Sequence, residues 1–236
     1  MHLPNLLTTA TSLTVAQSVL QTRIIGSSDS SSTPKLSTSR TIKLVAHITS
    51  SSDALGIDTY EANPFPLTDH CTNVLGYSPP GYGATFTFTA STTLLTPLTY
   101  RNGTLTTGGL TYNTSGGTST VPASVPVTAD CDAAGTLGIS VVTTDDGYPI
   151  VEFGGATTSG SSSSGGGWMA CPAATLGTRV GGDEGAVLVG VRRSGQRLLS
   201  GCEEVVFVTF CAEGDAEDGE NEDGVAVDCV VAEDKE

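Results

Sequence analysis

Two short stretches decide the fold of this chain, GGGWMACP at residues 165–172 and SGCEEV at residues 200–205. They hold the single tryptophan, Trp168, and two cysteines, Cys171 and Cys202. We expect these cysteines to form a disulfide that joins two strands, with Trp168 packed on the bridge. A bridge over a loop of this length stabilises a fold by about 3–4 kcal/mol, because it restricts the unfolded chain.

The chain has six cysteines, and none of them forms a Cys-x-x-Cys pair, which argues against zinc-finger and thioredoxin-type sites. The even number and the Asn-x-Ser/Thr sequons at Asn102 and Asn113 favour an oxidising, extracellular compartment. Buried free thiols in a cytosolic protein are the alternative. Sequence cannot choose rigorously among the possible connectivities. Our hypothesis for the disulfides is Cys71–Cys131, Cys171–Cys202 and Cys211–Cys229.

The composition favours an all-β domain. The 236 residues are 38% hydrophobic, which is enough for one domain with a core. Glycine, serine and threonine are abundant and typical helix formers are scarce, a mixture that favours short strands joined by turns. The spacing of the turn signals predicts a disulfide-stabilised β-sandwich or barrel.

The charge distribution excludes two classes of partner. The net charge is −15, and residues 211–236 carry 11 acidic residues and one lysine. The rest of the chain is mildly acidic and has no basic patch. Nucleic acid and anionic membrane surfaces both require clustered Lys and Arg, so we expect neither as a partner. No segment has the length of a membrane-spanning helix.

We divide the chain into four segments. Residues 1–20 resemble a secretory signal peptide, with a disordered leader as the alternative. Residues 21–40 form a Ser/Thr-rich linker that buries too little surface to become ordered. Residues 41–211 form the β-domain. Residues 212–236 form an acidic tail, expected to be largely disordered except where a disulfide tethers it.

Alternation of apolar and polar residues predicts the strands, most clearly at Thr41–Ile48, where His47 lies on the less apolar face and is expected to be solvated or paired across strands. Residues Asp58–Gly83 are rich in Pro, Asn and Tyr and are interpreted as loops. Asn102-Gly103 predicts a tight type I′ hairpin turn, and Gly108-Gly109 a second turn. Further strands are expected at Thr85–Thr89, Val121–Val127, Leu137–Val142, Pro149–Phe153, Gly167–Ala170, Ala186–Val191 and Val205–Phe210, with a turn at Asp145–Gly147.

No catalytic or metal-binding motif is evident. There is no Gly-x-Ser-x-Gly elbow, and the histidine that adjoins a cysteine, His70 next to Cys71, cannot activate a cysteine that is in a bridge. A calcium-loop pattern in the tail has Gly219 and Val230 at its two anchoring positions and therefore fails. We predict no metal, no cofactor and no enzymatic activity, and we predict a monomer.

Paired carboxylates keep a secreted glycoside hydrolase open as an alternative, because such pairs are recognised by geometry rather than by spacing. Most of the acidic residues of the domain flank turns or strand ends, where solvated carboxylates are ordinary. They are Asp58, Glu61, Asp69, Asp130, Asp132, Asp145, Asp146, Glu152, Asp183, Glu184, Glu203 and Glu204.

The binding candidates lie in the segment YSPPGY at residues 77–82. Tyr77 and Tyr82, held on a stiff Pro-Pro loop, could stack on the faces of sugars or on a protein partner. The favoured alternative is that one or both rings pack under the loop as part of the core.

The Gly-Trp-x-x-Cys stretch at residues 167–171, followed by residues 200–205, resembles a family of small fungal secreted proteins of unknown function. Ala170-Cys171-Pro172 and the later cysteine are also similar to the phialide-associated cell-wall proteins of filamentous fungi. Either resemblance covers about residues 41–211, and the Ser/Gly-rich insert at 157–166 and the acidic extension depart from it. The resemblance implies a fungal secreted or wall-associated domain without established catalytic residues.

These observations predict a secreted, non-catalytic β-domain, extracellular or in the cell wall, that acts by surface interaction. A wall-polysaccharide-binding module that uses Tyr77 and Tyr82 is the first alternative. The expected partner is therefore a cell-wall polysaccharide or an extracellular protein.

Overall fold

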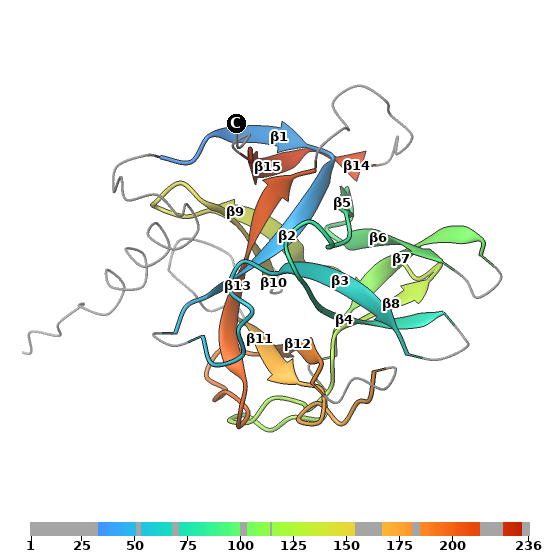
Figure 1. Ribbon diagram of the computed structural model, residues 1–236, viewed down its shortest axis with the longest axis vertical. Coiled ribbons are helices and arrows are strands. Elements are labelled where there is room, and N and C mark those ends of the chain that lie inside the picture. The colour runs from blue at the N-terminus through green and yellow to red at the C-terminus, as the bar shows by residue number, and fades with distance from the viewer. Residues whose placement is uncertain are drawn as a thin grey trace, which may run out of the picture. The chain divides into compact units, whose positions relative to one another are not determined.

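The computed structural model describes residues 33–50, 53–67, 71–99, 103–113, 115–153, 167–180, 185–212 and 224–232 (Figure 1). Within these ranges the regular elements are all β-strands, so the predicted all-β class is confirmed. The described part contains no apolar helix of membrane-spanning length. The expected signal peptide, most of the linker, Asn102, His70 and most of the acidic tail lie outside these ranges.

The strands of the described part are numbered in chain order. Their bounds are β1 Leu36–Ser39, β2 Thr41–Ile48, β3 Glu61–Pro66, β4 Thr72–Ser78, β5 Phe86–Thr89, β6 Leu94–Thr99, β7 Leu105–Thr111, β8 Thr128–Cys131, β9 Ile139–Thr143, β10 Pro149–Phe153, β11 Gly167–Pro172, β12 Val187–Arg192, β13 Glu203–Cys211, β14 Gly224–Val225 and β15 Val227–Val230.

A closed antiparallel barrel of nine strands forms the centre of the domain. Its strands follow in the order β2, β5, β6, β7, β8, β4, β12, β11 and β13, and β13 pairs with β2 to close it. Strand β3 pairs with both β2 and β4. Strands β9 and β10 form a hairpin, and β10 pairs with β13. Strand β14 pairs with β5, and β15 pairs with β13. Closure gives each barrel strand a neighbour on both sides over at least part of its length, which reduces the open edge at which strands aggregate.

The longest contact in the barrel is between β2 and β13, which run antiparallel from the pair Val205–Ile48 to the pair Cys211–Ile42. Every second residue of β2, from Ile42 to Ile48, is buried in the barrel, so this predicted strand is confirmed with its bounds. The solvated position expected for His47 was wrong, because its side chain is only 1% exposed. The cross-strand alternative agrees with the ladder, in which His47 lies opposite Val206 of β13, and its Nδ1 lies 3.1 Å from Oδ1 of Asp58.

The tryptophan lies in an aromatic cluster inside the barrel. The ring of Trp168 packs edge-on against Phe153 and Phe207, with centroid distances of 4.6 and 5.6 Å. Its Nε1 donates a 2.8 Å hydrogen bond to the carbonyl of Val151. Cys171 belongs instead to a second apolar cluster. Trp168 therefore does not pack on the bridge as expected, because residues an odd number apart point to opposite faces of a strand.

All three predicted disulfides are confirmed, and the described part has no free cysteine. The bridge between Cys211 and Cys229 fastens β15 beside the end of β13. Strand β15 also pairs with β1 from Leu36–Val230 to Ser39–Val227. The ordered domain was expected to begin at Thr41. It begins earlier, because β1 already belongs to the sheet. The serine and threonine side chains of β1 stay largely exposed, and the strand forms through its backbone hydrogen bonds rather than through burial.

The interpretation of Asp58–Gly83 as loops was wrong, because the segment contains β3 and β4. Strand β3 includes Pro64 and Pro66, and proline has no N–H to donate to a ladder. The strand tolerates both because it pairs along its length only with β4 and meets β2 only at Glu61. Proline is accepted on such an open side of a strand.

Residues Val121–Val127 were predicted to form a strand, and this was wrong. They form only an isolated bridge, between Pro126 and Gly190. Pro122 and Pro126 interrupt its backbone donors. Val127 still joins the sheet, since its N–H donates to Val189 and its carbonyl accepts from Leu75. The regular strand, β8, begins at the next residue.

The hairpin predicted around Asn102-Gly103 is present as β6 and β7, in which Thr99 lies opposite Leu105. The tight turn predicted between them includes Asn102, which lies outside the described residues. The second predicted turn, at Gly108-Gly109, was wrong, because both glycines lie inside β7. They are required there by close packing: a Cβ atom on Gly109 would lie 2.2 Å from the backbone N of Gly135. The Asp145–Gly147 turn joins β9 to β10 as predicted.

We expect Gly109→Ala to lower the free energy of unfolding by about 1–3 kcal/mol, because backbone rather than a flexible side chain must move aside. Urea unfolding followed by fluorescence of Trp168 measures the change. Thr107→Ala, at an exposed position of the same strand, is the control and should shift stability by less than about 0.5 kcal/mol. Equal stability of the Gly109 variant and the wild type would contradict the packing argument.

Candidate functional site

The two candidate tyrosines lie in different environments. Tyr77 is in β4, is 8% exposed, and stacks on Phe207 at a centroid distance of 6.0 Å. Burial raises the pKa of the Tyr77 phenol. Tyr82 is 78% exposed. A platform of two rings is therefore not formed, and Tyr82 is left as the candidate for contact with a ligand.

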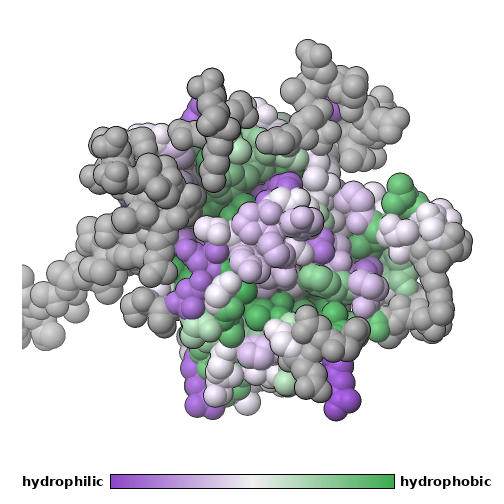
Figure 2. All heavy atoms as spheres, in the orientation of Figure 1, coloured by the Kyte–Doolittle hydropathy of each residue, from purple (hydrophilic) through white to green (hydrophobic). Residues whose placement is uncertain are grey.

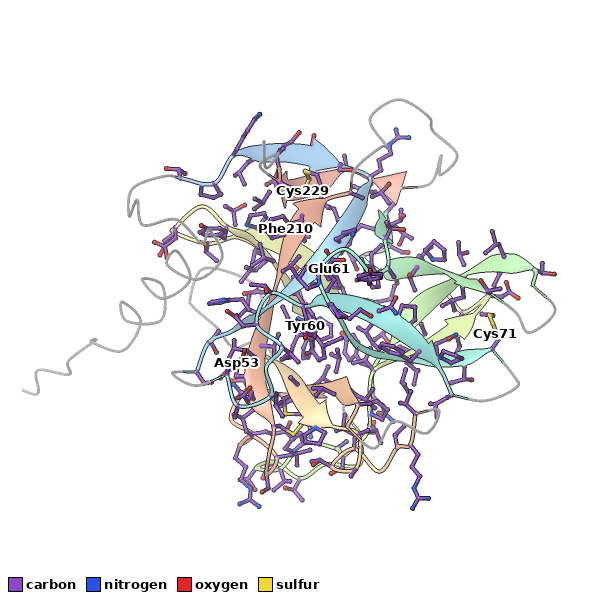
Figure 3. The ribbon with its side chains drawn as sticks, in the orientation of Figure 1. Asp53, Tyr60, Glu61, Cys71, Phe210 and Cys229 are labelled. Carbon is purple, nitrogen blue, oxygen red and sulfur yellow. A yellow bond between two sulfur atoms is a disulfide. The ribbon has the colours of Figure 1, made fainter. Side chains whose placement is uncertain are left out.

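The loop that carries Tyr82 is held by Glu61, the first residue of β3, which lies beside β2 (Figure 3). One carboxylate oxygen accepts a 3.0 Å hydrogen bond from the N–H of Gly81. The other accepts from the N–H of Gly83 at 2.7 Å and from Nζ of Lys43 at 3.0 Å. The residues on both sides of Tyr82 are thus fastened to one buried carboxylate. The N–H of Tyr82 also donates to the carbonyl of Pro79, which closes the turn.

The sequence Gly-Tyr-Gly at residues 81–83 is what allows this arrangement. Gly81 has φ of +89°, a conformation that L-residues rarely adopt. A Cβ atom on Gly83 would lie 2.2 Å from Cβ of Glu61. The two glycines therefore serve different purposes, the first for the turn and the second for close approach to the carboxylate.

Glu61 is ionised at neutral pH. Burial alone would raise its pKa, but the hydrogen bond from Gly81, the contact with Lys43 and the hydrogen bond from Gly83 together outweigh burial and lower the pKa below the usual 4.5. A carboxyl group with a lowered pKa is a poor general acid, because it is deprotonated at the pH at which it would act. The arrangement indicates a structural anchor rather than a catalytic group.

Other carboxylates of the domain also hold backbone. Asp53, Asp58 and Glu203 accept backbone N–H hydrogen bonds that shape the connection between β2 and β3. Glu204 pairs with Arg192. Asp69, Asp183 and Glu184 lie outside the described residues. Within the described ranges, no group of three or more His, Cys, Asp and Glu residues is placed to hold a metal ion.

Asn113, the sequon residue that the structure describes, is exposed. Its Oδ1 accepts a 2.7 Å hydrogen bond from the N–H of Ser115, and the side chain lies just beyond β7. An exposed loop position is what a glycan requires.

No family model, curated protein or solved structure matches this chain. The resemblance to fungal secreted and phialide-associated proteins therefore depends on the quoted residues alone and stays a prediction.

The sequence identified Tyr82 but not the residues that position it. Glu61 is one of many acidic residues in the sequence, and no pattern there marks Lys43. The one feature of the sequence that points to this arrangement is the pair Gly81 and Gly83 on either side of Tyr82. It does not say which carboxylate the loop contacts, because Pro64 and Pro66 conceal the strand in which Glu61 lies.

Proposed function

We propose that this protein is a secreted, non-catalytic β-domain that associates with the fungal cell wall by surface interaction, with Tyr82 as the central contact. One observation carries this proposal: an aromatic ring that is 78% exposed stands on a loop whose backbone is fixed on both sides by Glu61. A pre-organised aromatic residue is a favourable contact, because little conformational freedom is lost when a partner binds it.

The extracellular location is supported by the three disulfides, which form and persist in oxidising compartments. The exposed sequon at Asn113 agrees with it. The absence of catalysis is supported by the use of Glu61, Asp53 and Glu203 as backbone anchors. A glycoside hydrolase is the less favoured proposal, since it needs a carboxyl group that is free to donate a proton.

We expect Tyr82→Ala to abolish co-sedimentation of the full chain with an insoluble fungal wall preparation, with at least a tenfold loss of affinity. The free energy of unfolding should change by less than about 0.5 kcal/mol, because the ring is exposed. Leu105→Ala removes another exposed apolar side chain, one that is 74% exposed, and is the matched control that should bind normally. Unchanged binding of the Tyr82 variant, or no binding of the wild type, would contradict the proposal.

A further inference from the structure

The outer face of the barrel has a small hollow over strands β5, β6 and β7. Its volume is about 150 Å³. Its wall on one side is Gly224 of β14, which pairs with the end of β5. The lining residues are Thr87, Thr89, Leu95, Thr96, Pro97, Thr107 and Gly224. Sites for drug-sized ligands are larger, about 300–1,000 Å³, so this hollow fits one small unit of a ligand rather than a whole ligand of that size.

The lining contains no charged and no aromatic side chain. A charged ligand group buried here would have no counter-charge, which is energetically costly. Threonine hydroxyls both donate and accept hydrogen bonds, as the hydroxyls of a sugar do. Leu95 and Pro97 add aliphatic surface between these hydroxyls, which suits the C–H faces of a sugar ring. The lining chemistry therefore fits a neutral sugar residue.

The hollow and the Tyr82 loop lie on the same outer face. Thr41 of β2 is paired with Thr87 of β5, and both point outward, since Ile42 beside Thr41 and both strand neighbours of Thr87 are buried. Lys43 is two residues along β2 and so shares this face. It binds Glu61, which in turn binds the glycines on both sides of Tyr82. Tyr82 precedes Thr87 by five residues, a span of at most about 17 Å in extended chain.

The outward residues of the neighbouring strands are mixed in character, since Thr41, Lys43 and Thr87 are polar and Leu95 and Pro97 are apolar. On the face that Figure 2 draws, green hydrophobic residues of the described part are likewise interrupted by pale and purple ones. Such a surface does not indicate burial against a large apolar partner, which needs a contiguous apolar area. A mixed surface of this kind suits an extended ligand in which polar and apolar groups alternate.

We propose that the hollow is a subsite for one sugar residue of a neutral polysaccharide, and that the polysaccharide chain lies on the outer face from Tyr82 to the hollow. Tyr82 stacks on one sugar ring, and Thr87 and Thr107 bind the hydroxyls of another. This inference rests on the proposed function and names its ligand. It also gives a role to the C-terminal segment, because Gly224 is held at the hollow by β14 and by the disulfide of Cys229.

Isothermal titration of the full chain with two soluble probes, a hexamer of β-1,3-linked glucose and a hexamer of chitin, tests the inference. Thr87→Val and Thr107→Val preserve side-chain shape and remove the hydroxyls. Because each lost hydrogen bond weakens binding by about fivefold to tenfold, we expect the double variant to bind the recognised hexamer at least twentyfold more weakly. Thr99→Val, an exposed threonine of β6 outside the hollow, is the matched control and should bind normally.

The outcomes separate the inference from the function on which it rests. If both the Thr87/Thr107 double variant and Tyr82→Ala bind the hexamer more weakly, the extended site is supported. If only Tyr82→Ala does so, Tyr82 remains the contact and the subsite is overturned. If the wild type binds neither hexamer but sediments with the wall through Tyr82, the neutral polysaccharide is overturned and a wall protein is the partner.

Discussion

We expect reduction of the three disulfides to unfold the protein in buffer that contains no denaturant. The bridges join residues 60, 31 and 18 positions apart. Chain entropy gives about 3–4 kcal/mol for each loop of such length, and roughly 10 kcal/mol for the three together. Domains of ordinary size are stable by only about 5–15 kcal/mol. The contribution of the three bridges is therefore comparable to the whole free energy of unfolding of such a domain.

The measurement is near-ultraviolet circular dichroism of the aromatic cluster around Trp168, before and after reduction and alkylation. Removal of a single bridge separates local from global effects. Cys171→Ala with Cys202→Ala should cost about 3–4 kcal/mol, because the bridge joins the barrel strand β11 to the start of β13. Cys211→Ala with Cys229→Ala should release mainly β14 and β15. A reduced protein with an unchanged aromatic spectrum would show that the core alone determines the fold.

The sequence predicted those parts of the fold that depend on local pattern. Strand β2 follows from strict alternation. The three cysteine pairs agree with our hypothesis, although no local pattern could choose among the connectivities. Strand β3 could not be predicted in this way. Its prolines normally exclude a strand, and only the open side that tertiary packing leaves beside β3 makes them acceptable.

The glycines of β7 show the same limit. Gly108-Gly109 has the composition of a turn, but a third segment, around Gly135, passes so close that no side chain fits. A glycine in the sequence indicates a position that excludes a side chain. It does not indicate whether the cause is a turn or a close contact with another segment. The contact expected between Trp168 and the bridge of Cys171 fails for a related reason, because the two residues are near in sequence but point to opposite faces of β11.

The candidate site could be predicted in part. The exposed position of Tyr82 agrees with a loop of prolines and glycines, and the alternative that one ring packs into the core is confirmed for Tyr77. The anchor at Glu61 could not be predicted, because it depends on the pairing of β3 with β2 and β4. The sequence therefore identified Tyr82 as a candidate contact, but it did not identify Glu61 and Lys43, which hold the Tyr82 loop.

The second large effect is expected at this anchor, for Glu61→Ala. The carboxylate is 10% exposed, and its loss leaves Lys43, whose side chain is 25% exposed, and two backbone N–H groups without their acceptor. Removing one partner of a buried pair costs about 3–5 kcal/mol, and the exposure of Lys43 reduces this to about 2–4 kcal/mol. Urea unfolding gives the change, and hydrogen exchange of Gly81 and Gly83 should become faster in the variant.

The pH dependence provides a sharper test. Since the pKa of Glu61 is lowered in the folded state, its charge contributes stability that is fully present above the unfolded value of 4.5 and is lost as the pH falls through the folded value. Glu61→Gln retains one oxygen acceptor but cannot ionise. The difference in stability between wild type and Glu61→Gln should therefore be largest at neutral pH and shrink below pH 4.5.

Lys43→Met is the complementary control, because it removes the cation and leaves both glycine hydrogen bonds in place. It should cost less than Glu61→Ala and leave the exchange of Gly81 and Gly83 slow. If Glu61→Gln differs from wild type by the same amount at every pH, the carboxylate does not hold the loop by its charge. Tyr82 would then owe its position to the turn at Pro79 and to hydrogen bonds that need no charge, and Glu61→Gln would bind the wall as the wild type does.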